Sequence, residues 1–343
     1  MEYGSHPGGI VATVFQPTQT INDVFRHVLF TDDTDNTAHK NLLNRVYLYT
    51  KTVKKQLQIV TNQNSMTHCV LNSKLLPLAE AHISVADRGF RFGDGVFETI
   101  AVYGGVPYQW ELHQKRLESG LEAIKIRAET QNLRKLSLEL IAKNNVKNGV
   151  LRIAISRGVG SLGYFPDKPK ATVVIEAENR TFKAPDVIAL GLSSYEKPSP
   201  ACLPVEYKLA QGLNSTLARM EAVEKNCFDA LLLNGQKHIT ETSSANIFWI
   251  KDSMLYTPAP ECGVLLGTTR AAMIRLSPYP VRQGSFPLQE MLDAEEVFLT
   301  NAHWQILPVH RFENKTWTHH AYTEALQIIY RKDIESYVAA HRV

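Results

Sequence analysis

The chain has 343 residues, of which 44% are hydrophobic, so it is long enough to bury one large core or the cores of two compact domains. Its 37 Lys and Arg residues nearly balance its 34 Asp and Glu residues. The resulting formal net charge of +3 argues against a nucleic-acid-binding protein or a polybasic membrane-surface protein. The four cysteines form no C-x-x-C pair, so neither a zinc site nor a disulfide framework is indicated.

Neither a targeting leader nor a membrane span is indicated. The first nine residues lack the charged start and apolar core of a signal peptide, and no uninterrupted run of about 18 apolar residues occurs. We therefore expect a cytoplasmic protein with no nucleic-acid, membrane or metal partner.

Residues 1–65 differ in composition from the rest of the chain. They are rich in Thr, Asn, Asp and Lys and contain only short apolar islands, such as Val46–Tyr49, without a sustained period. A strand-like run, Cys69–Asn72, follows soon after Met66. We therefore expect an N-terminal extension of unknown role over 1–65 and a main folded unit that begins near Met66.

Residues 66–180 have the pattern of a small α+β domain. The strand signals are runs of β-branched and aromatic residues, and a Gly-Gly pair at 104–105 marks a hairpin turn. Strands are predicted at Gly95–Tyr103, Val106–Tyr108, Val150–Ser156 and Ala171–Ile175. An intervening helix presents Leu117, Leu121 and Ile124 on one face.

Residues 181–343 have the pattern of a larger α+β domain, entered through a polar linker at Glu176–Pro185. A helix over Leu213–Lys225 is expected to bury an apolar stripe, and a second helix begins at Thr268. The stripe consists of Leu213, Leu217 and Met220. Strands are predicted at Val187–Leu192, Ala230–Leu233, Asn246–Ile250 and Glu296–Thr300. The chain is therefore predicted to be an α+β protein of two domains after the extension.

Several polar residues are candidates for binding a phosphorylated cofactor. Lys208 lies just before the Leu213–Lys225 helix, and Glu241 is followed by small hydroxyl residues and an apolar strand. Gly267–Arg270 opens a helix, where free N–H groups favour a phosphate, and Arg116 could add a guanidinium. An amine, a carboxylate and a phosphate site are what an enzyme supplies to pyridoxal 5′-phosphate (PLP). Taken singly, each feature also fits an exposed charge or a helix cap.

The joint order of these residues resembles the class IV aminotransferase-like family of fold-type IV PLP enzymes. Ile83–Thr99 is similar to the family's N-terminal signature, Arg116 stands in its H-x-x-R-L pattern, and Gly263–Arg270 is similar to a later motif. The resemblance runs from about residue 69 to the end of the chain. The cofactor contacts that it implies are Lys208 as the Schiff-base lysine, Glu241 at the pyridine nitrogen, and Arg116, Thr268 and Thr269 at the phosphate.

The resemblance also implies an architecture. We expect the D-amino-acid aminotransferase-like fold, with a small domain over 66–180 and a larger PLP-binding domain over 181–343. We further expect a homodimer whose sites take residues from both subunits and act on a small-molecule substrate.

Three activities share this scaffold: branched-chain aminotransferase, D-amino-acid aminotransferase and 4-amino-4-deoxychorismate lyase. The run Phe97–Ala101 lacks the glycine and arginine of the branched-chain pattern F-E-G-x-R. Phe97 also replaces the tyrosine of the D-amino-acid enzymes, and residues 157–166 lack the R-x-H carboxylate trap of those enzymes. Both transaminase assignments therefore lose support.

Two segments resemble the lyase instead. Ser156–Tyr164 is similar to its S-R-G-x-G-x-x-G-Y loop, although Leu162 stands where that loop often has arginine. Asn301 occupies a position where the lyase typically has asparagine. We therefore expect lyase activity, with a class IV transaminase acting on branched-chain or D-amino acids with 2-oxoglutarate as the alternative. The substrate contacts expected are Phe97, Arg157 and Asn301.

Overall fold

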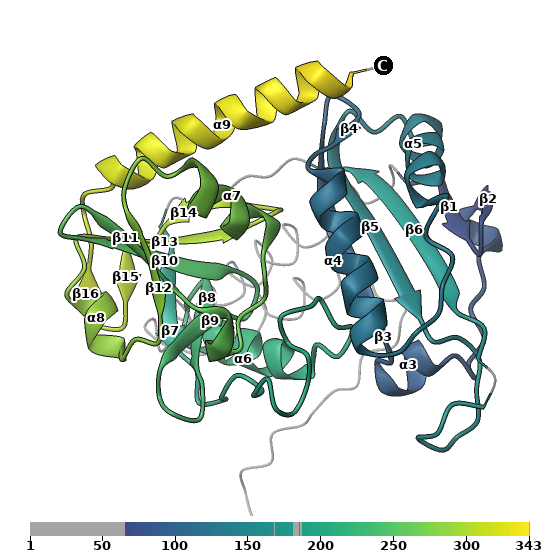
Figure 1. Cartoon of the computed structure of the whole chain (residues 1–343), viewed down its shortest axis with the longest axis horizontal. Coiled ribbons are helices and arrows are strands. Elements are labelled where there is room, and N and C mark those ends of the chain that lie inside the picture. Colours follow the sequence, from purple (N-terminus) through teal and green to yellow (C-terminus); the bar gives the residue numbers. More distant parts are fainter. Residues whose placement is uncertain (1–65, 168, 181–184, 186, 343) are drawn as a thin grey trace, which may run out of the picture. The chain divides into compact units, whose positions relative to one another are not determined.

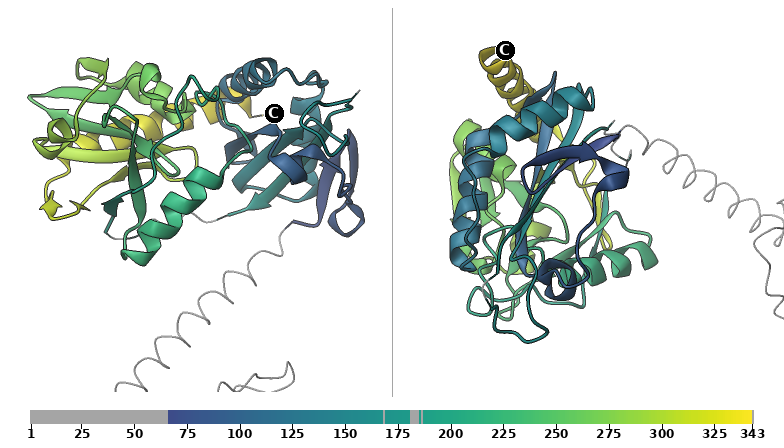
Figure 2. Two further views of the ribbon diagram at one scale, coloured as in Figure 1. Left: turned by 90° about the horizontal axis from the view of Figure 1, so that it is seen from below. Right: turned by 90° about the vertical axis from the view of Figure 1, so that its right-hand side faces the viewer.

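The computed structural model describes residues 66–167, 169–180, 185 and 187–342. The expected extension over 1–65 lies outside the described residues. The described part contains two β-sheets, each packed against helices (Figures 1 and 2). In this part of the chain, no helix is long and apolar enough to cross a membrane.

The first sheet has six antiparallel strands in the order β2-β1-β6-β5-β3-β4. Its strands are β1 (His68–Leu71), β2 (Lys74–Pro77), β3 (Gly95–Tyr103), β4 (Val106–Pro107), β5 (Asn148–Ser156) and β6 (Thr172–Asn179). The helical segments of this region are η1 (Leu78–Glu80), α3 (Arg88–Phe92), α4 (Trp110–Ala123) and α5 (Leu133–Lys143). Leu117 and Leu121 of α4 and Leu140 of α5 share one core with Leu151 and Ile153 of β5, so both helices cover the same face of the sheet.

The second sheet has ten strands and mixed direction. Its main path is β12-β11-β10-β9-β8-β7-β15-β16, while β13 pairs with both β10 and β14. The strands are β7 (Ala189–Leu192), β8 (Asp229–Leu233), β9 (Ile239–Thr242), β10 (Asn246–Lys251), β11 (Met254–Pro258), β12 (Val281–Gly284), β13 (Glu296–Asn301), β14 (Gln305–Pro308), β15 (Arg311–Phe312) and β16 (Lys315–Thr316). The helices are α6 (Leu213–Glu224), η2 (Pro260–Cys262), α7 (Thr268–Leu276), α8 (Leu288–Leu292) and α9 (Ala321–His341).

Strand β10 is the apolar centre of this sheet. Successive side chains of a strand point to opposite faces. Ile247 and Trp249 accordingly enter one core, while Phe248 and Ile250 enter the core on the other face. The continuous apolar run of β10 is thus explained by burial on both sides.

Helix α9 ties the two sheets together. It packs against α7, β13 and β14 and runs toward β4 (Figure 1). There the hydroxyl of Tyr108 donates to Asp333 over 2.5 Å, and the N–H of Trp110 donates to the hydroxyl of Tyr337 over 3.1 Å. Because Trp110 is the first residue of α4, these contacts fix α4 relative to α7.

The α+β class is confirmed, and the second helix begins at Thr268 as predicted. The polar linker was placed too early, because β6 continues to Asn179 opposite β5. Ala177 of β6 faces the core, while Glu176 and Glu178 point to the other face, so the polar residues are compatible with a strand.

The predicted inner stripe of the Leu213–Lys225 helix is wrong. Leu213 is 71% exposed and Met220 is 55% exposed, whereas Ala218 and Ala222 are buried against β8. Leu217 is only partly buried. Small alanine side chains let the helix approach the strand closely, which leaves the larger apolar side chains on the outer face.

Candidate active site

A cavity of about 450 Å³ collects residues from both halves of the described chain. Its lining includes side chains of β3 and α4, the segment before α6, the β9–β10 turn, the start of α7 and the β13–β14 turn. Five of the predicted cofactor residues line it: Lys208, Arg116, Glu241, Thr268 and Thr269. Phe97 and Asn301 also line the cavity, and Arg157 does not.

The position of Lys208 is set by its backbone. The segment that carries Lys208 runs beside β3, where the N–H of Phe97 donates to the Lys208 carbonyl over 2.9 Å. One residue on, Leu209 forms an antiparallel bridge with Val96. The Nζ of Lys208 lies 4.4 Å from the centroid of the Phe97 ring.

Burial, assisted by the positive charge of Arg116, lowers the pKa of Lys208 to about 8. A neutral amine is the form that attacks a carbonyl and accepts a proton. Lys208 therefore has the protonation behaviour that covalent cofactor attachment requires.

Glu241 is the next-to-last residue of β9, and its carboxylate accepts three hydrogen bonds. Its Oε1 accepts from Nζ of Lys197 over 2.5 Å, and its Oε2 accepts from Nδ2 of Asn246 over 2.8 Å and from the N–H of Leu265 over 3.0 Å. Sequence reasoning missed Lys197, because its partner lies 44 residues away in the chain and no spacing motif marks it.

Arg116 lies beside the start of α7. Its Nε and Nη2 donate to the two carboxylate oxygens of Glu98 over 2.7 and 2.6 Å, and its Nη1 donates to the Leu266 carbonyl over 2.8 Å. Helix α7 begins after Gly267 without a side-chain cap, so the first N–H groups of Thr268 and Thr269 have no partner within the helix. Such a helix start next to a guanidinium suits a phosphate group.

Two residues that contact Arg116 and Thr268, Glu98 and His113, were not predicted from the sequence. Although burial opposes ionisation of Glu98, Arg116 and His113 bring the pKa of its carboxyl down to about 2. The H-x-x-R-L spacing was the available signal, because positions i and i+3 lie on the same side of a helix.

Another part of the cavity lining is held by a buried carboxylate. Asp229 accepts hydrogen bonds from the hydroxyls of Thr242, Ser243 and Ser244 over 2.9, 2.5 and 2.7 Å. The carbonyl of Ser244 then accepts from Nδ2 of Asn301 over 3.1 Å. A chain of hydrogen bonds from Asp229 therefore fixes the turn that presents Asn301.

Asn301 organises the β13–β14 turn in its own right. Its Oδ1 accepts from the N–H groups of His303 and Trp304 over 3.0 and 2.6 Å, and both of these residues line the cavity. Burial lowers the pKa of His303 to about 4, so its ring is neutral. The wall presented to a substrate is therefore an amide and two aromatic rings without a charge.

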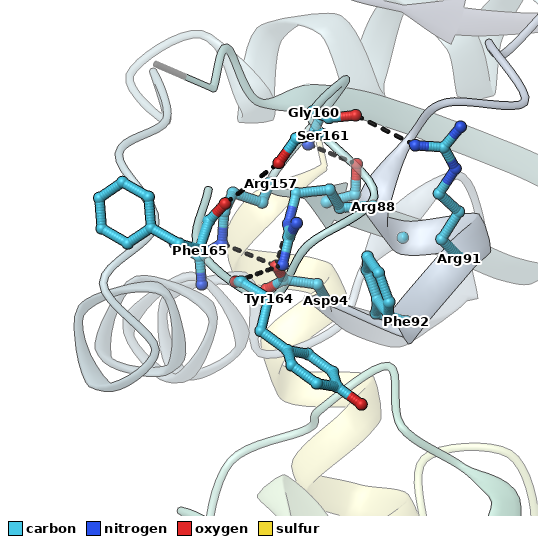
Figure 3. Close-up of polar contacts among 12 residues, drawn as sticks. Arg88, Arg91, Phe92, Asp94, Arg157, Gly160, Ser161, Tyr164 and Phe165 are labelled. Atoms are coloured by element: carbon cyan, nitrogen blue, oxygen red, sulfur yellow. Dashed lines mark hydrogen bonds and ion pairs between the residues drawn. The ribbon is translucent and has the colours of Figure 1, made fainter. Parts of the chain in front are cut away.

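Arg157 is not brought to the cavity. Its Nε donates to Asp94 over 2.8 Å (Figure 3). Its terminal nitrogens donate to the carbonyls of Lys125 and Ile124 over 2.9 and 2.7 Å. The next residue, Gly158, has φ +87°, and an added Cβ would lie 1.7 Å from the Lys170 carbonyl oxygen. The arginine-glycine motif therefore builds a tight loop in this structure.

A different arginine stands near the cavity. The guanidinium of Arg152 lies over the ring of Phe97, with its Cζ 4.2 Å from the centroid. Arg152 is exposed and also opposes protonation of Lys208. Sequence reasoning missed it because Arg152 sits inside a strand with an otherwise apolar pattern.

The residues present fit PLP. A lysine of lowered pKa, a fixed carboxylate and an uncapped helix start beside a guanidinium surround one cavity of the size typical for small ligands. The buried hydroxyl of Thr300 lines the same cavity without a hydrogen-bond partner among the described residues. In that part of the chain, no group of three or more His, Cys, Asp or Glu side chains could hold a metal ion.

The profile of the amino-transferase class IV family matches residues 95–312. The chain belongs to this family. Members of the class IV family use PLP, and the chain is accordingly a PLP-dependent enzyme.

Named relatives within the class IV family carry different activities. A D-alanine aminotransferase of Listeria innocua is 29% identical over 248 residues, covering 70% of this chain and 86% of the relative. An aminodeoxychorismate lyase of Vibrio harveyi is 30% identical over 241 residues, covering 68% of this chain and 88% of the relative. The crystal structure of 4-amino-4-deoxychorismate lyase from Pseudomonas aeruginosa matches with a TM-score of 0.70 and 27% identity, covering 78% of this chain and 99% of that one. These similarities alone do not choose between a transaminase and a lyase.

Proposed function

We propose that the protein is a 4-amino-4-deoxychorismate lyase, which releases pyruvate and p-aminobenzoate for folate biosynthesis. The observation that carries the proposal is the uncharged part of the cavity lining formed by Asn301, His303 and Trp304. The features of the transaminases are missing from the cavity. Phe97 has no hydroxyl, and the arginine position of the branched-chain pattern is Ala101, a small buried residue.

Each cofactor residue has a role in this reaction. PLP, when bound, supplies the electron sink. Arg116 and the start of α7, with Thr268 and Thr269, would hold its phosphate, and Glu241 would pair with its ring nitrogen. Lys208 would hold the cofactor covalently and, as a neutral amine, would remove a proton from the substrate.

The proton that Lys208 takes comes from the substrate ring carbon that carries the amine. Loss of this proton makes the ring aromatic while the enolpyruvyl ether bond breaks. The departing group gains a proton on its methylene carbon and leaves as pyruvate, so the atoms of the substrate are divided between the two products. A lysine with a pKa of about 8 is suited to accept and return a proton near neutral pH.

Arg152 is the proposed partner for the charge of the substrate. Chorismate-derived substrates carry two carboxylates, and the terminal nitrogens of the Arg152 side chain make no hydrogen bond to the residues described. The position over Phe97 places a guanidinium beside the cavity, where it can recognise a carboxylate in bidentate geometry. Arg152 takes the role predicted for Arg157, which donates to Asp94, Lys125 and Ile124 and does not line the cavity.

The alternative is a class IV transaminase acting on branched-chain or D-amino acids. The similarity to the Listeria D-alanine aminotransferase supports it. In that reaction Lys208 would move the substrate proton onward to the cofactor, and a keto acid such as 2-oxoglutarate would be needed to complete each cycle.

One experiment separates the two activities. The holoenzyme is supplied with aminodeoxychorismate and no keto acid, and pyruvate and p-aminobenzoate are measured. Parallel reactions contain leucine or D-alanine with 2-oxoglutarate. We expect many turnovers to both lyase products. Amino-group transfer from leucine or D-alanine without p-aminobenzoate formation would refute the lyase proposal.

We also propose that the protein acts in the cytoplasm as a homodimer. Its second copy would cover two exposed apolar surfaces, of which the first is the outer face of α6 (Leu213, Met220 and Val223). The second is the loop 159–165, where Tyr164 is 89% exposed and Phe165 is 82% exposed. Large apolar surfaces of this kind commonly mark interfaces.

The loop 159–165 is held in shape although its aromatic side chains face solvent. The buried guanidinium of Arg88 donates to the carbonyls of Gly163 and Tyr164 over 2.7 and 2.9 Å and pairs with Asp94 over 2.9 Å (Figure 3). Arg91 adds a hydrogen bond to the Gly160 carbonyl over 3.1 Å. A loop that is ordered by buried charges while it exposes aromatic rings is prepared for docking, which supports contact with a second copy.

A further inference from the structure

A line of four side chains connects the start of α7 to Arg116. The hydroxyl of Thr268 lies 3.2 Å from Nε2 of His113, and Nδ1 of His113 lies 2.6 Å from Oε2 of Glu98. Glu98 in turn accepts from Nε and Nη2 of Arg116. Thr268, His113 and Glu98 are all buried, so water does not compete for these contacts.

The proton positions along this line follow from Glu98. Because Glu98 is ionised, with a pKa of about 2, it can only accept, and Nδ1 of His113 must carry the hydrogen between them. Burial lowers the pKa of His113, and Arg116 and Lys208 act in the same direction against the opposing charge of Glu98. In the neutral ring Nε2 has no hydrogen and accepts from the Thr268 hydroxyl.

With a neutral His113, the Thr268 hydroxyl cannot donate to a phosphate bound at the start of α7. A threonine hydroxyl has one hydrogen, and in the neutral state of His113 that hydrogen points at Nε2. Thr268 would then turn only lone pairs toward the cavity, which repel phosphate oxygens. The hydrogen can turn to the phosphate if Nε2 becomes a donor, which requires a proton on His113.

We propose that His113 takes up a proton when a phosphate-bearing ligand binds at the start of α7, and so acts as the residue that positions the Thr268 hydroxyl toward the phosphate. The proposal depends on the phosphate placement given above and is independent of whether the enzyme is a lyase or a transaminase. The protonated ring would donate to Glu98 through Nδ1 and to Thr268 through Nε2. It would thereby join two anions, the Glu98 carboxylate and the phosphate.

The sign of the pH dependence follows from the charges that face His113. They are Glu98 on β3, Arg116 on α4 and Lys208 before α6, joined on binding by the phosphate at α7. A phosphate dianion raises the pKa of His113 above its value in the free protein. Binding therefore takes up a proton when the pH lies between these two pKa values. Affinity therefore falls by up to about tenfold per pH unit as the pH rises from the lower pKa to the higher one, and it levels off above the higher one.

The test uses apoenzyme and pyridoxamine 5′-phosphate, which has no aldehyde and does not react with Lys208. Titration calorimetry in buffers of different ionisation enthalpy, over about pH 6 to 8.5, counts the protons taken up. Two variants cannot titrate at this position. His113→Asn keeps a donor near Nδ1, and His113→Gln keeps an amide near Nε2.

We expect the wild-type protein to take up close to one proton more than either variant, because protonation of the ligand itself cancels in the difference. The pH dependence of affinity should flatten in both variants. Thr268→Val, which leaves His113 in place, should lose at least half of the extra uptake. Pyridoxamine without the phosphate should give no extra uptake.

A measurement on the wild-type protein covers the case in which the His113 variants do not fold. In ¹⁵N spectra of histidine-labelled enzyme, one more imidazolium ring should appear when pyridoxamine 5′-phosphate binds. Equal proton uptake in wild type and variants, or no new imidazolium signal, overturns the proposal. Neither result depends on the reaction catalysed, so the lyase proposal is tested independently by the formation of pyruvate and p-aminobenzoate.

Discussion

At the scale of single residues, two lysines share the cavity and their surroundings differ. Lys208 lies over the Phe97 ring and has a pKa lowered to about 8 by burial and by Arg116. Lys197 donates its ammonium to Glu241 in a partly buried ion pair. An amine held in an ion pair is a poor nucleophile, whereas a lysine of lowered pKa is the usual site of covalent attachment.

This difference predicts which lysine holds PLP. Lys208→Ala should lose the visible absorbance of the bound cofactor and the adduct that borohydride makes permanent. Lys197→Ala is the matched control and should retain both, although its turnover should fall because Glu241 loses a partner. Mass spectrometry of the reduced protein locates the adduct. A cofactor attached in Lys208→Ala and absent in Lys197→Ala would reverse the assignment.

At the scale of elements, strands were easier to predict from sequence than the direction in which a helix faces. The β-branched runs of β3 and β5 match the strands that pair along their whole length. For α6, the hydrophobic period pointed to Leu213 and Met220, but packing against β8 uses Ala218 and Ala222. Which side of a helix is buried depends on the strand against which it packs, and the local hydrophobic pattern contains no information about that strand.

The cavity residues also divide into those that a local pattern predicts and those that depend on distant parts of the chain. Lys208, Glu241 and Arg116 stood in motifs and line one cavity. Lys197 and Arg152 lay outside every motif, because their placement depends on residues distant in the chain. Arg157 stood in a motif whose glycines build a tight loop, and its guanidinium donates to Asp94 and to two backbone carbonyls away from the cavity.

The exposed apolar face of α6 is part of the proposed dimer interface, so a charge placed on it should weaken the dimer. Val223→Asp or Met220→Asp would place a charge in an apolar interface, and each buried apolar side chain contributes about 1.5–3 kcal/mol. Dimer dissociation should therefore rise by roughly 100-fold, since about 1.4 kcal/mol corresponds to a factor of ten. Ile328→Asp, on the exposed side of α9, is the control and should leave the dimer intact. Light scattering measures the mass, and an unchanged mass in both α6 variants would exclude this face.

At the scale of the whole molecule, strand β1 anchors the edge region of the first sheet. Strand β1 pairs with both β2 and β6, and it buries Cys69 and Val70 in the first sheet. Asn144, at the end of α5, holds the start of the strand by accepting from the Thr67 hydroxyl over 3.2 Å and from the N–H of His68 over 3.0 Å. All of these contacts are made by residues after Met66.

A chain that begins at Met66 should therefore fold, bind PLP and turn over within about twofold of the full chain, since it keeps the contacts that hold β1 and all the cavity residues named above. A chain that begins at Val70 is the matched control. It loses the Asn144 contacts and the burial of Cys69, and its free energy of unfolding should fall by about 2 kcal/mol. Denaturant unfolding and cofactor content measure the two effects. If the chain from Met66 aggregates or loses PLP as readily as the chain from Val70, residues 1–65 are required for the enzyme and are not an appendage.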